Sequence, residues 1–289
     1  MNVYNPYERE GFYMENRVEK RSKLKSLAEK KPILFGIVSV VVVFALYGLA
    51  SMGSFSLVAP FIGSSPAYLF GGILRIIFSV PAIILLGYTV QANGFKYAFS
   101  TRGFAKSIFA GIPILIYFAT IIPMLFLFRI HADFAPTIPA FIFQQITVGL
   151  FEESLFRGLM MTALIARYCD KARNRFFVVL ICGFLFGVLH VVNTFASGDD
   201  TIAISVIVAG IAFSVVYLYS KNLLGCMVLH AIYDILIGIY GVLIVDVGNE
   251  TVFQSLQSIS TLALLAMPLL AIPWIVMAKP LNLLQHKLP

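Results

Sequence analysis

The sequence predicts an all-α fold, a polytopic helical membrane protein with about eight transmembrane helices. Of its 289 residues, 60% are hydrophobic and 12% are charged, and the mean hydropathy is +0.91. A soluble domain has about a quarter of its residues charged, so an ordinary water-soluble enzyme is excluded. The apolar residues gather in runs of about 20, the length that a helix needs to cross a bilayer. None of the runs has the short alternating pattern of a membrane barrel, so all are expected to be helices.

The chain is predicted to form one membrane domain between two polar ends. Residues 1–32 are rich in charge and are expected to form a cytosolic arm, residues 33–278 the transmembrane domain, and residues 279–289 a cytosolic tail. The predicted spans are about 33–51, 67–90, 106–128, 139–166, 176–195, 201–219, 223–245 and 257–278.

The distribution of charge sets the predicted orientation. Eighteen of the 21 Lys and Arg residues lie in the arm, in the tail or in loops on one side of the predicted spans. Short cytoplasmic loops hold an excess of basic residues, so both termini are expected in the cytosol, with the protein in the plasma (cytoplasmic) membrane. The net charge of +7 is therefore a topology signal and indicates no nucleic-acid partner.

A few ionisable residues remain inside the predicted spans. An ionisable side chain within a bilayer costs free energy, and a residue of this kind usually has a function. Arg75 lies near the outer end of its span and is expected to snorkel toward the interface. The others are Glu152, Glu153, Arg157, His190, His230 and Asp234.

The fourth span carries two adjacent glutamates followed by an arginine. Glu153 and Arg157 are four residues apart and can pair on one helix face. Glu152 is rotated by about 100° from Glu153, which leaves its carboxylate free. The alternative is that both acids only pair with basic groups to hold helices together.

The fifth and seventh spans each add residues at helical spacing. Phe186 and His190 share one face, and His230 and Asp234 share another. At about 1.5 Å per residue, Glu152 and His190 each lie roughly 21 Å from the cytosolic ends of their spans, Asp234 about 17 Å and His230 about 10 Å. These depths predict a polar cluster within the membrane.

Such a cluster supports three kinds of chemistry. Glu152 and His190 could activate a water for attack on a carbonyl, and His230 could stabilise the oxyanion. The same His190, His230 and Glu152 could instead bind a catalytic zinc, although no H-E-x-x-H fixes that geometry. A third hypothesis is a proton relay through Glu152, His190 and Asp234 in a proton-coupled transporter.

Three motifs in order resemble those of the CPBP intramembrane protease family, which includes type II CAAX prenyl proteases and bacteriocin-processing or immunity proteins. They are the E-E-x-x-x-R of Glu152 to Arg157, the F-x-x-x-H of Phe186 and His190, and the H-x-x-x-D of His230 and Asp234. The resemblance covers about residues 139–245, which would be the protease core.

The resemblance implies an intramembrane endopeptidase that hydrolyses a peptide bond and requires no cofactor, although a metalloprotease label has long been attached to the family. Glu152 and His190 would activate water, and His230 with Asp234 would form the oxyanion site. Glu153, Arg157 and Phe186 would support them. The substrate would be a peptide or protein at the bilayer, and it could be lipidated.

One position departs from the prenyl proteases, which carry Asn where this chain has Asp234. An ionised Asp cannot donate to an oxyanion, so it would be protonated or would orient His230. A non-catalytic immunity or scaffold protein built on the same fold is a further alternative.

Overall fold

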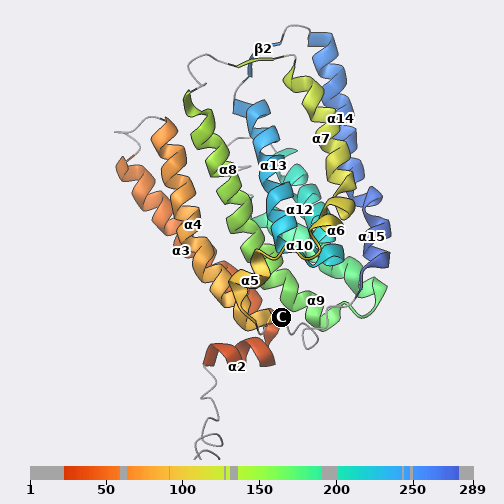
Figure 1. Ribbon diagram of the computed structural model, residues 1–289. Coiled ribbons are helices and arrows are strands. Elements are labelled where there is room, and N and C mark those ends of the chain that lie inside the picture. Colours follow the sequence, from red (N-terminus) through yellow and green to blue (C-terminus); the bar gives the residue numbers. More distant parts are fainter. Residues whose placement is uncertain are drawn as a thin grey trace, which may run out of the picture.

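A computed structural model of the chain shows a bundle of long helices (Figure 1). It describes residues 23–58, 64–90, 92–126, 128–130, 136–190, 201–242, 244–247 and 250–279. Five parts of the predicted arm, spans and tail lie outside these residues: positions 1–22 of the arm, 127 of the third span, 191–195 of the fifth, 243 of the seventh and 280–289 of the tail.

Within the described residues, each of the eight predicted spans is mainly helical. The helical elements are α2 (Lys23–Lys30), α3 (Pro32–Val58), α4 (Ser64–Val90), α5 (Gly94–Ala98), α6 (Phe104–Ala110), α7 (Ile112–Leu125), α8 (Ile138–Glu153), η3 (Ser154–Met161), α9 (Thr162–Tyr168), α10 (Ala172–Leu189), α12 (Thr201–Ser220), α13 (Leu223–Val242), α14 (Glu250–Leu270) and α15 (Ile272–Met277). The prediction of a helical membrane protein is therefore confirmed in its coarse form.

Fewer helices than eight qualify as spans by length and apolar composition. Among the described residues, four helices qualify, at Pro32–Ser51, Pro66–Val90, Ala172–Leu189 and Glu250–Met277. The pair α6 and α7, bent by 65°, makes a fifth if it is one span. The apolar parts of α12 and α13 are shorter, and α8 with η3 carries the charges of the EExxxR motif. The count of eight spans and the cytosolic termini stay predictions.

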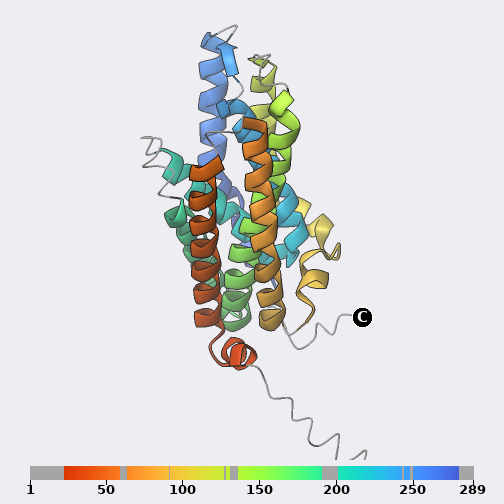
Figure 2. The same cartoon turned by 90° about the vertical axis from the view of Figure 1, so that its left-hand side faces the viewer.

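A two-stranded ribbon is the one departure from an all-helical chain within the described residues. Strand β1 (Phe128–Ile130) pairs antiparallel with β2 (Ile244–Val247), with Phe128 opposite Val247 and Ile130 opposite Ile244. The ribbon lies at one end of the bundle, and α2, α5 and the turn from α9 to α10 lie toward the other (Figures 1 and 2). At each of these two strands the sequence predicts the end of a span followed by a loop. Segments of three and four residues are too short to show the alternating hydrophobic pattern of a strand.

Helix α8 is the centre of the arrangement. It packs against α4 on one side and α13 on the other, and α10 packs against α12 (Figure 1). Gly149 permits the close approach of α8 to α13, since an added Cβ would lie 2.8 Å from the Met227 oxygen and 3.0 Å from the Ala231 nitrogen. Small residues at helix contacts in membranes let backbones approach in this way. The approach brings the end of α8 beside His230.

Candidate active site

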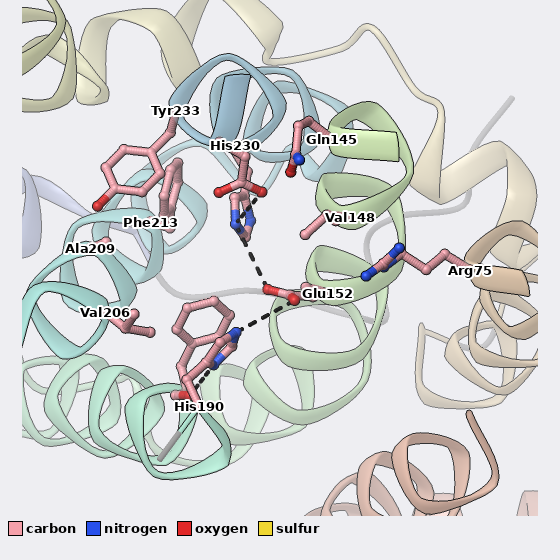
Figure 3. Close-up of a pocket in the computed structure, with 12 residues that line it drawn as sticks. Arg75, Gln145, Val148, Glu152, His190, Val206, Ala209, Phe213, His230 and Tyr233 are labelled. Carbon is pink, nitrogen blue, oxygen red and sulfur yellow. Dashed lines mark hydrogen bonds and ion pairs between the residues drawn. The ribbon is translucent and has the colours of Figure 1, made fainter. Parts of the chain in front are cut away.

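Three helices supply the polar cluster that the sequence predicted. Glu152 and Glu153 end α8, His190 caps the C-terminus of α10, and His230 and Asp234 lie four residues apart on α13. Figure 3 shows Glu152, His190 and His230 pointing toward one another across a cavity. The predicted convergence of these side chains is thus present in the structure.

Glu152 is the meeting point of the cluster. Its Oε1 lies 3.5 Å from His190 Nε2, and its Oε2 lies 3.8 Å from His230 Nε2. The Glu152 side chain is 13% exposed and faces a cavity of about 250 Å³. This carboxylate is therefore accessible to a small reactant although protein surrounds most of it.

The side chain of His190 is held in a defined orientation by Phe186. His190 Nδ1 lies 2.8 Å from the Phe186 carbonyl oxygen, which can only accept a hydrogen bond. The Phe186 and His190 ring centroids are 4.6 Å apart. With Nδ1 as the donor, neutral His190 presents the lone pair of Nε2 toward Glu152.

Glu153 and Arg157 form the buried ion pair that their spacing predicted. Arg157 Nη1 donates to Glu153 Oε1 at 2.8 Å, and both side chains are at most 1% exposed. Arg157 Nη2 donates to the carbonyl of Gly210 on α12 at 2.9 Å. The ion pair does not line the cavity, and its hydrogen bond to Gly210 links α8 and η3 to α12.

Arg157 lies in the π-helical segment η3, whose eight residues are all buried. Thr162 Oγ1 donates to the Arg157 carbonyl, five residues back, at 2.9 Å. Single π turns are frequent at functional sites, because they redirect side chains from the regular helical path. The sequence predicts one regular helix over 139–166, since no residue type marks a π turn.

His230 links the buried ion pair to the cavity. Its Nδ1 lies 2.7 Å from Glu153 Oε1, and its ring stacks on Phe213 at 4.8 Å between centroids. On the other side of the ring, Nε2 lies 3.4 Å from Asp234 Oδ2. Both nitrogens of His230 therefore face carboxylate oxygens, but only Nδ1 is within a hydrogen bond of one, which leaves Nε2 available to the cavity.

Asp234 lines the cavity with one oxygen unsatisfied. Its Oδ2 is buried and makes no hydrogen bond within the described part of the chain, despite its proximity to His230 Nε2. Buried polar atoms nearly always have a partner, so such an atom at the wall of a cavity is open to a bound molecule.

Arg75 differs from its predicted snorkelling position. It lines the same cavity as Glu152, and Figure 3 shows its guanidinium directed from α4 toward that carboxylate. Its Nη1 is buried and has no hydrogen-bond partner among the described residues. The expectation of snorkelling was wrong because α4 packs on α8, so this face of α4 borders the cavity.

The neutral residues of the cavity wall were not among the predicted site residues. Gln145 and Val148 precede Glu152 by seven and four residues on α8, so helical spacing could have found them. The remaining members have no sequence signal, because they are ordinary apolar or aromatic residues of their helices: Val206, Ala209, Phe213 and Tyr233.

The predicted zinc ligands face one another without forming a recognisable metal site. In the described ranges, no three His, Cys, Asp or Glu side chains are grouped as a metal site would need. Zinc requires its ligands at about 2.0–2.2 Å in a tetrahedral arrangement, with a second shell that orients each His. Here Nδ1 of His230 is oriented by Glu153 and Nδ1 of His190 by a backbone carbonyl, which suits either a metal or a protein-only site.

Comparison with known proteins agrees with the motifs. The sequence model of the family described as type II CAAX prenyl endopeptidase Rce1-like matches residues 134–236. No curated protein and no solved structure matches the chain. The matched segment contains all three motifs and every residue that the sequence placed in the cluster. Over this segment, which spans the EExxxR, FxxxH and HxxxD motifs, the chain is similar to the type II CAAX prenyl endopeptidases, and the match supports the resemblance to the CPBP intramembrane protease family.

Proposed function

We propose that the protein is an intramembrane endopeptidase in which Glu152 and His190 activate a water molecule. The observation that carries the proposal is the placement of Glu152 between His190 and His230 at the wall of one cavity. The match to a peptidase family supports hydrolysis of a peptide bond as the reaction.

The first step is attack of water on the scissile carbonyl. Glu152 Oε1 and His190 Nε2, 3.5 Å apart, can both accept hydrogen bonds from one water in the cavity. As the water oxygen bonds to the carbonyl carbon, Glu152 takes the proton. The same proton is then delivered to the leaving amine as the C–N bond breaks, which returns Glu152 to its ionised form.

The oxyanion forms opposite the attacking water and is stabilised by His230. The Nε2 of His230 is the ring nitrogen that faces the cavity, and its hydrogen can donate to the developing charge. Asp234, 3.4 Å from this nitrogen, orients the donor or donates itself when protonated.

Glu153, Arg157 and Phe186 act as positioning residues. Glu153 accepts from His230 Nδ1, and Arg157 neutralises Glu153, so the charge of Glu152 remains the one available for chemistry. Phe186 lies against the ring of His190 and, at 5.9 Å between centroids, against that of His230.

The substrate is a peptide or protein at the membrane, of which a lipidated chain is one form, and the protein acts in the plasma membrane. The apolar helices and the peptidase family support an integral membrane protein. The family description names prenyl endopeptidases, which supports a substrate segment presented from the bilayer.

Terminal proteomics tests this function even while the substrate is unidentified. Membranes of cells that carry the wild type should contain new peptide termini that disappear with Glu152→Gln and with His190→Ala. Glu250→Gln, at an exposed glutamate of α14, is the matched control and should retain every terminus. Retention of the termini by Glu152→Gln would contradict the mechanism, and a phenotype rescued by that variant would indicate a non-catalytic scaffold.

Two further measurements separate the alternatives. Cleavage by purified protein should survive thorough chelation, whereas loss that zinc restores would favour the metal-dependent version through Glu152, His190 and His230. Flux of solute in proteoliposomes that depends on pH, with no peptide product, would favour the proton-coupled transporter.

A further inference from the structure

The guanidinium of Arg75 is a charged group at the cavity that makes no direct ion pair with any residue the structure describes. No carboxylate oxygen of those residues lies within 4.0 Å of it, and its buried Nη1 makes no hydrogen bond to them. Figure 3 shows it on the far side of Glu152 from His190. Arg75 as a whole is half-buried, but a buried polar atom without a partner is costly, so its Nη1 requires an explanation.

Aromatic packing holds Arg75 in place at the cavity wall. The guanidinium carbon lies 5.5 Å from the ring centroid of Tyr47 on α3, a cation–π distance. Tyr47 in turn packs on Phe151 of α8 at 4.7 Å and on Phe78 of α4 at 5.9 Å between centroids. The donors of Arg75 are thus preorganised by three helices before any ligand binds.

The cavity wall differs in character on the two sides of Glu152. Arg75 and Gln145 form a polar wall with donors, whereas α12 supplies an apolar wall of Val206, Ala209 and Phe213 (Figure 3). A peptide that crosses this cavity would therefore place an apolar side chain at one wall and an acceptor, best an anion, at the other.

We propose that Arg75 binds a carboxylate of the peptide substrate close to the scissile bond. Carboxylates suit the fork of an arginine, because two parallel N–H···O bonds form at once. The cavity of about 250 Å³ is small, and a strand advances about 3.3 Å per residue, so this carboxylate belongs to a residue near the cleaved bond. It is either the C-terminal α-carboxylate of the substrate or an Asp or Glu side chain. The inference rests on the proposed peptidase function.

Fluorogenic decapeptide libraries test this role with the full-length protein in phospholipid nanodiscs. Each peptide is made with a free C-terminal carboxylate, with a C-terminal amide, and with a C-terminal amide plus one internal Glu. Binding and kcat/KM are measured for the wild type, Arg75→Gln and Arg75→Lys. Arg102→Gln, at an exposed arginine outside the cavity, is the control for loss of a positive charge.

The wild type is expected to prefer the carboxylate forms by about 10- to 100-fold, the range for hydrogen bonds to a charged group. Arg75→Gln should treat carboxylate and amide forms alike, and Arg75→Lys should keep part of the preference. Preference for the free C-terminus alone assigns the α-carboxylate, and preference for the internal Glu assigns the side chain.

If Arg75→Gln lowered kcat/KM equally for the carboxylate and amide forms of a peptide, the proposal would be overturned, because Arg75 would then act through Glu152. Absence of any wild-type preference would overturn it as well. A binding preference that depends on Arg75 without cleavage of any peptide would support the subsite and refute the peptidase function, so the two failures are distinguishable.

Discussion

Removal of the Arg157 charge should expose how the buried Glu153 supports the site. The two side chains are at most 1% exposed and their atoms are 2.8 Å apart. At that separation and an effective dielectric constant of about 20, their attraction is about 6 kcal/mol before desolvation is subtracted. Breaking a buried pair by removing one partner costs about 3–5 kcal/mol, so Arg157→Met should lower the free energy of unfolding by that amount.

A double-mutant cycle separates the ion pair from the other contacts of Arg157. Glu153→Gln keeps an oxygen that can accept from His230 Nδ1 but removes the charge. Combined with Arg157→Met, it should recover about 2 kcal/mol relative to the sum of the two single losses, because no unpaired charge remains. Equilibrium unfolding in mixed micelles, followed by circular dichroism at neutral pH, measures each variant, with the exposed Arg102→Met as control.

Additivity of the two losses within about 0.5 kcal/mol would refute the reasoning. In that case the loss in Arg157→Met would come from its hydrogen bond to the Gly210 carbonyl and its packing on Phe186, not from the charge of Glu153.

Three further predictions concern helix contact, pH and the oxyanion site. Gly149→Val should cost about 1–3 kcal/mol of stability and reduce peptide cleavage, because the side chain would force α8 from α13; Gly48→Ala, where an added Cβ has no described atom within 4 Å, should be neutral in both assays. Burial lowers the pKa of the Lys221 amine, between α12 and α13, to about 7. Since the unfolded chain then binds more protons between about pH 7 and 10, the stability of the wild type relative to Lys221→Met should rise over that range in unfolding titrations. Asp234→Asn should retain cleavage, because an amide can donate to the oxyanion, whereas Asp234→Leu should lower kcat by about 10²-fold; equal loss in both would contradict the donor role.

Much of the candidate site could be predicted from sequence because lipid makes charge rare and therefore informative. Glu153 and Arg157 were expected to pair from their spacing alone, and they do so at 2.8 Å. The common depth of Glu152, His190 and Asp234 followed from counting residues along helices of known rise, and all three line one cavity. Spacing within a helix is a local property, so it can be read directly from the order of the residues in the sequence.

The sequence by itself determined the helical membrane class and the residues of the candidate polar cluster, because hydrophobic runs and isolated charges are local signals. Only the tertiary structure decided how the helices meet. It turned Arg75 into the cavity instead of toward the interface, formed the π turn around Arg157, and placed Phe213 against His230. These features depend on contacts between helices far apart in sequence, such as the approach of α8 to α13 at Gly149, and no local pattern encodes them.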